Sequence, residues 1–311
     1  MDPLKGRDLL SLADLSPSEL THILDVAKAQ KRAWKFAGNR SQPLAGKAVA
    51  LVFQKPSMRT RVSFEVACVR LGAHPVTLAG TDSAFSRGES VYDTTKVLER
   101  YCDAIVIRTF EQSMVEQVAE FAQVPVVNAL TDDHHPCQGL ADLLTVDEHR
   151  GGLSGLRFAY VGDGNNMAHT YLLGGALAGM EVSIATPPGY EPKPEVVARA
   201  REIAQSTGGR IAVGTDPVQA VSGADVVATD TWASMGQESE HAERVAAFEP
   251  YRVDDALMAQ AAEHAIFLHC LPAHRGEEVT DAVIDSARSV VFDEAENRLH
   301  AQKALLSLLL G

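Results

Sequence analysis

The sequence of 311 residues contains 46% apolar residues and carries a net charge of −13, from 28 basic and 41 acidic side chains. Because this length exceeds the usual size of one hydrophobic core, we expect two domains, each with enough apolar residues to fill it. A nucleic acid backbone attracts lysine and arginine, so the negative net charge argues against nucleic acid as a partner.

The amino-terminal segment and the cysteines indicate a cytoplasmic protein. No run of about 18 uninterrupted apolar residues occurs, and the first residues, which include Asp2, Lys5 and Arg7, lack the hydrophobic stretch of a secretory signal. We therefore expect no association with a membrane. The four cysteines are widely scattered, which fits reduced thiols better than a disulfide framework.

Apolar runs typical of strands alternate with segments of helical periodicity along the chain. The predicted strands are residues 48–53, 104–107, 124–127, 157–161, 181–185, 224–228 and 265–268. This alternation indicates an α/β fold with parallel sheets. Residues 148–155 combine glycine with polar side chains, so we expect a first domain of residues 1–147 and a second of residues 148–296. We expect a leucine-rich helix over residues 297–311 to join the first domain.

The segment after the first predicted strand has the features of a phosphate site. Its sequence is Ser57-Met58-Arg59-Thr60-Arg61. Ser57 is a natural N-cap, the first N–H groups of a helix have no partner within it, and the helix dipole adds positive charge beside two guanidinium groups. The alternative is a capped surface helix with two solvated arginines, and this segment alone does not decide between them.

Polar residues also follow five later predicted strands, at the edge where open parallel sheets bind ligands. These polar endings are Arg108-Thr109, Thr131-Asp132-Asp133-His134-His135-Pro136-Cys137-Gln138, Gly162-Asp163-Gly164-Asn165-Asn166, Asp230-Thr231-Trp232-Ala233-Ser234 and His269-Cys270-Leu271-Pro272. Loop chemistry alone does not account for so many polar strand ends.

The loop that begins at Gly162 matches the dinucleotide-binding fingerprint only in part. Met167 occupies the place of the third glycine, and the next strand ends in Ala185-Thr186-Pro187 rather than in an acidic residue. We therefore expect no dinucleotide cofactor. The loop is either a turn with a helix cap, or it presents the Asn166 amide to a ligand.

The histidines and cysteines lack the spacing of common zinc sites, so we expect no metal. His135 is either a local hydrogen-bonding group or a donor to a carbonyl oxygen. Cys270 is either a buried inert thiol or a group exposed at a strand end, and no thiol-protease signature accompanies it. Asp230 is either a turn-former or part of a binding loop.

Five motifs, in this order and at these separations, resemble the ornithine carbamoyltransferase family over nearly the whole chain. They are Ser57-Met58-Arg59-Thr60-Arg61, His135-Pro136-Cys137-Gln138, Asp163-Gly164-Asn165-Asn166, Asp230-Thr231-Trp232-Ala233-Ser234-Met235-Gly236-Gln237-Glu238 and His269-Cys270-Leu271-Pro272. The resemblance implies two doubly wound parallel-sheet domains of the α/β class, with the active site in the cleft between them. It also implies transfer of a carbamoyl group from carbamoyl phosphate to L-ornithine, in arginine metabolism, without a cofactor or metal.

The resemblance assigns roles to residues of both domains. It implies that the first domain holds carbamoyl phosphate through Ser57, Met58, Arg59, Thr60, Arg108, His135, Gln138 and Arg298. It implies that the second domain binds the α-amino acid end of ornithine through Asn166, Asp230, Ser234 and Met235, while Cys270 and the backbone of Leu271 contact the reacting amine. Thr60, Arg108 and His135 would stabilise the oxyanion, and Cys270 would orient the amine or handle its proton.

One position departs from the family, and several alternatives stay open. Ala84 stands where relatives often carry glutamine in a loop that reaches a neighbouring subunit, and alanine cannot donate a hydrogen bond there. The family is commonly built of trimers, so the resemblance implies a homo-oligomer. Other readings are a carbamoyltransferase for an amine such as putrescine, or a homologue that binds carbamoyl phosphate without turnover.

Overall fold

The computed structural model describes residues 2–36, 38, 40–80, 88–233 and 240–311. Contacts between residues divide the chain into two units. Unit 1 comprises Met1–Leu144 and Glu296–Gly311, and unit 2 comprises Thr145–Ala295. Each unit contains a parallel sheet flanked by helices, so the predicted α/β class with two parallel-sheet domains is confirmed.

Unit 1 alternates strands and helices from β1 onward. Its elements are η1 (Leu12–Asp14), α1 (Pro17–Phe36), β1 (Ala48–Phe53), α2 (Met58–Leu71), β2 (His74–Ala79), α3 (Val91–Tyr101), β3 (Ala104–Arg108), α4 (Gln112–Phe121), β4 (Val126–Leu130), most of α5 (Pro136–Arg150) and most of α12 (Val291–Leu310). Among the described residues, its sheet has the order β2-β1-β3-β4, with every pair parallel. From β1 the chain adds β2 on one side of the sheet and then β3 and β4 on the other side, so the strand order reverses between β1 and β3. Doubly wound sheets bind ligands at this switch point, beyond the carboxyl ends of the two strands.

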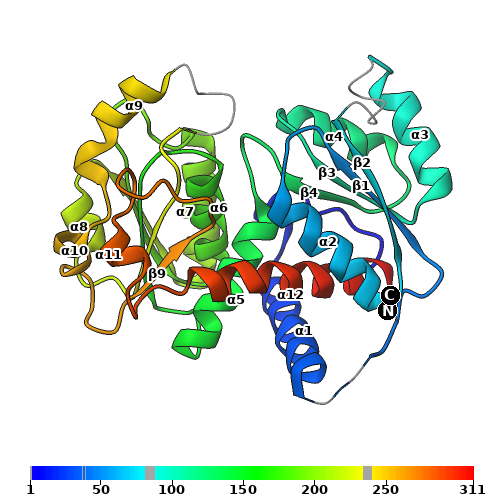
Figure 1. Ribbon diagram of the computed structural model, residues 1–311, viewed down its shortest axis with the longest axis horizontal. Coiled ribbons are helices and arrows are strands. Elements are labelled where there is room, and N and C mark those ends of the chain that lie inside the picture. Colours follow the sequence, from blue (N-terminus) through cyan, green and yellow to red (C-terminus); the bar gives the residue numbers. More distant parts are fainter. Residues whose placement is uncertain (1, 37, 39, 81–87, 234–239) are drawn as a thin grey trace. The chain divides into compact units, whose positions relative to one another are not determined.

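Helices cover both faces of the unit 1 sheet (Figure 1). On one face, Leu98 of α3 and Val115 of α4 pack against alternate residues of the strands, such as Val52 and Ile105. Figure 1 shows α2 and α12 on the other side of the sheet. The carboxyl-terminal half of α12 is buried, and Ser307 on it accepts a hydrogen bond from Gln30 of α1 at 2.8 Å.

Unit 2 has the same alternating order of strands and helices. Its elements are β5 (Arg157–Val161), α6 (Asn166–Leu177), β6 (Glu181–Ala185), α7 (Pro194–Thr207), β7 (Arg210–Gly214), α8 (Pro217–Val221), β8 (Val226–Thr229), α9 (His241–Phe248), η5 (Glu249–Tyr251), α10 (Asp255–Met258), β9 (Ile266–His269) and α11 (Asp281–Ile284). Among the described residues, its parallel sheet has the order β7-β6-β5-β8-β9. The reversal of direction here lies between β5 and β8, so a ligand is expected beyond the ends of these two strands.

The core of unit 2 joins helices to one face of its sheet. Val227 of β8 and Phe267 of β9 are fully buried among residues of α8, α10 and α11, such as Val221, Leu257 and Val283. Figure 1 shows α6 and α7 on the opposite side of this sheet. Every residue from Met167 to Leu177 in α6 is buried, which explains why this helix shows no amphipathic pattern.

Two strands were missing from the sequence prediction, and both lie at sheet edges. β2 (His74–Ala79) and β7 (Arg210–Gly214) are only partly buried, because within the described ranges each pairs with a strand on one side only. Edge strands need fewer apolar residues, so their sequences lack the apolar runs on which the prediction depended.

Several predicted strand and helix boundaries were displaced, most of all those of β4 and of the terminal helix. The strand predicted at residues 124–127 is β4 at Val126–Leu130, because Pro125 has no N–H and pairing begins after it. The terminal helix begins at Val291 rather than at residue 297, and its acidic first turn of Asp293 and Glu294 suits the positive end of the helix dipole.

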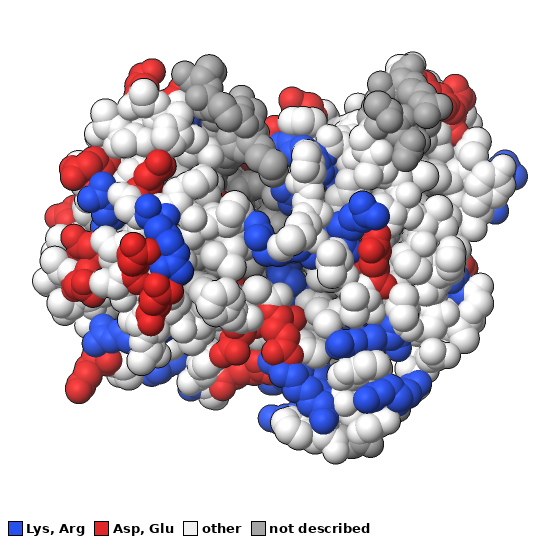
Figure 2. Space-filling view, viewed as in Figure 1, with Lys and Arg blue, Asp and Glu red and all other residues white. Residues whose placement is uncertain are grey.

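In the part of the chain that the structure describes, no helix combines the length and apolar content that crossing a bilayer requires. On the face drawn in Figure 2, acidic and basic side chains are interspersed. The net negative charge is therefore not gathered into a single patch on that face.

Candidate active site

The β1–α2 loop of unit 1 forms a capped helix start, as the sequence predicts. Ser57 has extended backbone angles, and its Oγ accepts a hydrogen bond from the Thr60 N–H at 3.3 Å. This cap uses one of the first N–H groups of α2, while those before it point out of the helix start. The strand end, the cap and the helix dipole together favour an anion at this position.

Arg298 joins two of the other predicted site residues of unit 1. It lies on α12 and is only 3% exposed. Its Nη2 donates to Oγ1 of Thr60 at 3.0 Å, and its Nη1 donates to Oε1 of Gln138 in a close hydrogen bond. Residues that are distant in sequence therefore meet at one planar guanidinium group, which has the geometry for holding oxygen atoms.

Arg108 and His135 belong to the same group of side chains. Arg108 is the last residue of β3 and His135 directly precedes α5, and both are buried. Burial, followed by the charges of Arg298 and Arg108, lowers the pKa of His135 well below its usual range. The imidazole is therefore neutral at physiological pH, and a neutral imidazole offers one N–H as a donor.

Lys55 lies in the β1–α2 loop and connects it to neighbouring loops, and it was not singled out from the sequence. It is 5% exposed, its Nζ forms a close ion pair with Asp132, and it stands 4.2 Å from the ring centroid of Phe110. It thereby ties the β1–α2 loop to the loops that follow β3 and β4. Nothing in the sequence around Lys55 distinguishes it from a surface lysine.

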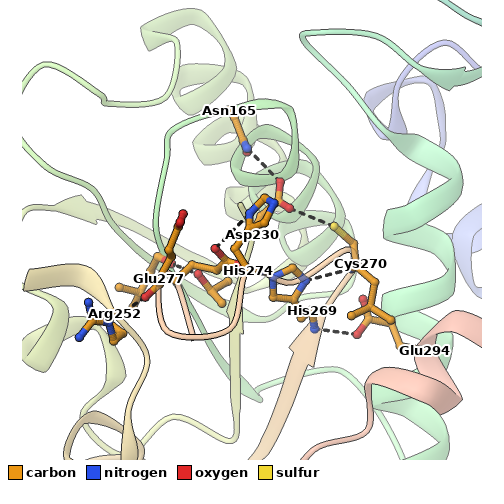
Figure 3. Close-up of polar contacts among 12 residues, drawn as sticks. Asn165, Asp230, Arg252, His269, Cys270, His274, Glu277 and Glu294 are labelled. Atoms are coloured by element: carbon orange, nitrogen blue, oxygen red, sulfur yellow. Dashed lines mark hydrogen bonds and ion pairs between the residues drawn. The ribbon is translucent and has the colours of Figure 1, made fainter. Parts of the chain in front are cut away.

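In unit 2, Asp230 lies at the end of β8 and receives hydrogen bonds from two other strand ends. Asn165 donates from Nδ2 to Oδ2 at 3.0 Å, and Cys270 donates from Sγ to Oδ1 at 3.2 Å. Figure 3 shows these two residues approaching the carboxylate from different sides. The residues that follow β5, β8 and β9 thus converge at the reversal point of the sheet.

The asparagine bonded to Asp230 is Asn165, whereas the sequence analysis selected Asn166. Asn165 is the N-cap of α6, and its Oδ1 accepts from the N–H groups of Met167 and Ala168 at 2.9 and 3.3 Å. Since capping uses the oxygen, the amide nitrogen is directed to the carboxylate. Asn166 is the first residue of α6, and its role in ligand binding stays a prediction.

Two buried glutamates support the loop that carries Cys270. Glu294 accepts the N–H of His269 at 2.8 Å, and Glu278 lies 3.1 Å from Nε2 of the same histidine (Figure 3). The Nδ1 of His269 accepts the N–H of Leu271 at 2.9 Å, so its Nε2 carries the proton. Leu271 itself has φ of 58°, the only positive φ of a residue other than glycine within the described ranges.

Asp163 and Arg244 form a buried ion pair near the ends of β5 and β8. Nη1 of Arg244 donates to Asp163 at 2.9 Å and to the carbonyl oxygen of Trp232 at 2.9 Å. Burial raises the pKa of Asp163 to about 6, although the Arg244 guanidinium opposes this rise. The pair fixes the start of the loop that follows Asp230, and Arg244 was not anticipated from the sequence.

The glycines of the β5–α6 loop serve packing within the unit. A Cβ on Gly164 would lie 2.3 Å from the carbonyl oxygen of Tyr190, and one on Gly162 would lie 3.2 Å from the hydroxyl of Tyr160. These approaches account for both glycines without a pyrophosphate. β6, the next strand, is followed by the buried Thr186 rather than by the acidic residue that would bind a ribose hydroxyl. The geometry of this loop therefore gives no support to a dinucleotide site.

Among the described residues, possible metal ligands meet at two places. Asp230, His269 and Cys270 each offer a ligand atom within 4.8 Å of the others, and so do His274, Glu277 and Glu278. Spacing along the chain does not indicate either group, because the members of each come together only in the folded protein. Both nitrogens of His269 take part in hydrogen bonds within the protein. The grouping of Asp230, His269 and Cys270 is therefore accounted for by hydrogen bonding, without a metal ion.

Six residues named in the sequence analysis lie outside the described residues. They are Ser234 and Met235, which were predicted to bind ornithine, the motif residues Gly236, Gln237 and Glu238, and Ala84 in the loop that departs from the family pattern. Their roles stay predictions.

The motifs that resemble one family thus lie at the ligand-binding edges of two α/β units. Residues 7–148 match the family model described as aspartate/ornithine carbamoyltransferase, carbamoyl-P binding domain, and residues 154–309 match the Asp/Orn binding domain of the same description. The chain belongs to the aspartate/ornithine carbamoyltransferase family. The family resemblance read from the sequence is therefore confirmed.

Relatives within this family match the chain over its whole length. Ornithine carbamoyltransferases from Carboxydothermus hydrogenoformans and Anoxybacillus flavithermus are 56% and 55% identical to it, each over 99% of this chain and 98% of the relative. The solved structure of ornithine carbamoyltransferase from Pyrococcus furiosus superposes with a TM-score of 0.97 at 50% identity, covering 100% of this chain and 99% of that one. The fold described above is therefore the family fold.

Proposed function

We propose that this protein is an ornithine carbamoyltransferase, which transfers the carbamoyl group of carbamoyl phosphate to the δ-amine of L-ornithine and releases L-citrulline and phosphate. The relatives of 55–56% identity carry that name. The observation that carries the proposal is the convergence of Asn165 and Cys270 on the Asp230 carboxylate at the reversal point of the unit 2 sheet. A carboxylate held in this way is suited to an ammonium group of an amino acid.

In this proposal, unit 1 binds carbamoyl phosphate. The phosphate is held by the helix start and side chains of Ser57, Met58, Arg59, Thr60 and Arg108, while His135, Gln138 and Arg298 hold the carbamoyl group. The hydrogen bonds from Arg298 to Thr60 and Gln138 support this assignment, because they orient both side chains without a ligand. The predicted domain of residues 1–147 with 297–311 is then the carbamoyl-phosphate domain.

The predicted domain of residues 148–296 is then the ornithine domain. Asp230 accepts the α-ammonium group, and Asn166, Ser234 and Met235 complete recognition of the amino acid end. Cys270 and the backbone of Leu271 receive the δ-amine. A free alkylamine resembles lysine and is protonated at neutral pH, so the δ-ammonium must lose a proton before it can attack.

The proposed chemistry is one addition followed by one elimination. The neutral δ-nitrogen forms a bond to the carbonyl carbon, and the carbonyl oxygen becomes an oxyanion that Thr60, Arg108 and His135 stabilise. The C–O bond to phosphate then breaks, and the arginines hold the departing dianion. The amine proton passes to the departing phosphate, or to Cys270 once that residue has released to solvent the proton that it donates to Asp230 in the structure. No covalent bond to the protein is required.

We further propose that the enzyme serves arginine biosynthesis in the cytoplasm as a homotrimer or a multiple of trimers. The Pyrococcus furiosus relative, 51% identical, is named the anabolic ornithine carbamoyltransferase. Val62 and Val69 on α2 expose 51% and 60% of their surface, which supports burial against another copy. Light scattering coupled to size exclusion gives the mass of the assembly directly.

The test of the proposed activity is a parallel assay of three amines. Purified protein is incubated with carbamoyl phosphate and either ornithine, putrescine or aspartate, from neutral to alkaline pH, and the carbamoylated products are measured. We expect citrulline from ornithine and little product from the others. Preferred turnover of putrescine would move the assignment to another carbamoyltransferase, and tight binding of carbamoyl phosphate without any product would indicate a binding protein.

A matched pair of variants connects the activity to the β1–α2 loop. Arg59→Ala removes a guanidinium group from the proposed cradle, whereas Arg61→Ala removes one that is held by Glu65 at 2.9 Å on the same helix. We expect the first change to weaken carbamoyl phosphate much more than the second. Equal losses in the two variants would count against the cradle.

A further inference from the structure

Asp142 is a buried carboxylate beside Gln138, and the sequence analysis gave it no role. It lies one helical turn beyond Gln138 in α5, and both residues are 1% exposed. Nε2 of Gln138 donates to Oδ1 of Asp142 at 2.7 Å. Asp142 is thus in contact with a proposed binding residue without being one itself.

The hydrogen-bond partners of Gln138 determine which way its amide points. A carboxylate only accepts hydrogen bonds and a guanidinium only donates them. The amide nitrogen therefore faces Asp142, and the amide oxygen faces Arg298, from which it accepts. The opposite orientation would place an oxygen against a carboxylate and an N–H against a guanidinium, both of which are repulsive.

In the proposed function Gln138 holds the carbamoyl group, so this orientation makes its amide oxygen, which faces Arg298, the atom available to that group. A carbonyl oxygen has two lone pairs, so Oε1 of Gln138 can accept from Arg298 and from a second N–H at the same time. A carbamoyl group ends in NH2, which supplies that N–H. An acetyl group of nearly the same size ends in CH3, which supplies none.

Resting on the proposed function, we propose that Asp142 is a specificity-determining positioning residue for the first substrate. By orienting Gln138, it makes the site select acyl phosphates that carry an NH2 group and disfavour those that carry a methyl group. The selection acts on the acyl end of the ligand only. The phosphate end is held by the β1–α2 loop and does not depend on Asp142.

The test uses a pair of stable ligands that differ in one group. Phosphonoacetamide presents NH2, and 2-oxopropylphosphonate presents CH3 on an otherwise matching skeleton. Calorimetry gives the dissociation constants of both for the whole protein, with inorganic phosphate as a third ligand. Because a site built around a hydrogen bond rejects ligands that lack it, we expect the wild type to prefer the amide by roughly tenfold or more.

Three variants separate orientation from general damage. In Asp142→Ala, the preference for the amide falls toward unity while the affinity for inorganic phosphate stays within about twofold of the wild type. Asp142→Asn retains an oxygen that can accept from Gln138, so it keeps part of the preference, falling by roughly threefold. Asp8→Asn is the matched control, because Asp8 accepts the Val126 N–H at 2.7 Å elsewhere in unit 1, and it should leave the preference unchanged.

The inference is overturned if Asp142→Ala keeps the full preference, or if it weakens all three ligands by the same factor. If Asp142→Ala does not fold, Asp142→Asn decides, and a preference equal to that of the wild type overturns the inference. A wild type that binds both phosphonates equally overturns it as well. A lack of citrulline from carbamoyl phosphate and ornithine counts instead against the proposed function, since the calorimetry needs no turnover.

Discussion

The Sγ of Cys270 lies 3.2 Å from Oδ1 of Asp230, and the thiol donates its hydrogen to that carboxylate. The other oxygen of Asp230 accepts from Asn165 at 3.0 Å. Both carboxylate oxygens are thus engaged by side chains that come from neighbouring strand ends. The carboxylate that we propose as the acceptor for the amine substrate is therefore oriented before any ligand arrives, which reduces the ordering cost of binding.

Replacing Asp230 by asparagine tests its role in amine recognition. The change keeps the size of the side chain and removes its charge, and hydrogen bonds to charged groups contribute about 1.5–3 kcal/mol. We expect the KM for ornithine to rise by roughly ten- to a hundredfold while the dissociation constant of carbamoyl phosphate changes by less than about twofold. Steady-state kinetics and calorimetry measure the two quantities. Asp225→Asn, at a carboxylate that accepts the Arg157 N–H, is the control, and an equal loss of affinity for both substrates would contradict the prediction.

Replacing Cys270 by alanine distinguishes an orienting thiol from a nucleophile. If no covalent intermediate forms, the variant keeps measurable turnover, and we expect kcat to fall by roughly ten- to a hundredfold rather than to zero. Cys102→Ala removes a buried thiol of unit 1 and should leave kcat near that of the wild type. Complete loss of citrulline with both substrates still bound, or a carbamoyl adduct on Cys270 by mass spectrometry, would overturn this prediction.

Replacing Arg298 by lysine tests the planar guanidinium that joins Thr60 and Gln138. Lysine carries the same charge but cannot donate to both side chains in the same geometry. We expect the dissociation constant of carbamoyl phosphate to rise by roughly ten- to a hundredfold, with a smaller effect on the KM for ornithine. The control is Arg288→Lys, at an arginine that donates to the Met258 carbonyl oxygen in unit 2. An unchanged affinity in Arg298→Lys would show that charge alone is sufficient.

The stability of the protein should depend on pH through His300. This residue is 1% exposed, and burial lowers its pKa to about 4, although the hydrogen bond to Glu296 opposes the shift. The unfolded histidine, with a pKa of about 6.5, binds a proton that the folded one does not, so the free energy of unfolding falls as the pH drops from about 6.5 to 4. The loss from this residue amounts to about 3 kcal/mol.

Urea unfolding of the wild type and of His300→Gln across this pH range measures the effect. The difference between the two free energies of unfolding should change with pH, whatever its value at neutral pH. Parallel curves for the wild type and His300→Gln would rule out this contribution.

Two glycines of unit 2 should respond in opposite ways to alanine. A Cβ on Gly164 would lie 2.4 Å or less from backbone atoms of Tyr190, Glu191 and Pro192, and backbone cannot move aside easily. We expect Gly164→Ala to lower the free energy of unfolding by about 3 kcal/mol. Gly214 at the end of β7 has no atom within 4 Å of a built Cβ, so Gly214→Ala should be neutral or slightly stabilising. Thermal unfolding compares them, and similar melting temperatures for both variants would contradict the packing argument.

The sequence predicts the buried strands well because they are continuous apolar runs. β1, β5 and β6 have the predicted limits, whereas β2 and β7 escaped detection because none of their residues is fully buried and neither strand is a continuous apolar run. The fold class followed from the alternation of strands and helices. The exact start of a helix did not, so the cap of α6 by Asn165 and its bond to Asp230 were not anticipated, and the role of Asn166 stays a prediction.

The candidate site could be predicted where polar residues follow strands, and not where support comes from elsewhere. Thr60 and Gln138 were named from their loops, and Arg298 was named from the family resemblance. Lys55, Asp142 and Arg244 were missed because their roles depend on partners that only the folded chain brings near, such as Asp132 for Lys55 and Asp163 for Arg244. A buried charge has no local sequence pattern of its own.

Each unit has its own sheet with its own ligand-binding switch point, and this separation has a consequence for how members of the family acquire new substrates. The loops that we assign to the amine follow strands of one sheet, and those that we assign to the acyl phosphate follow strands of the other. Substitutions around Asp230 can therefore redirect the chain toward a new nucleophile while the activated donor and its leaving group are retained. One ancestral framework can in this way give rise to catalysts for different amino acids by changes confined to half of its gene.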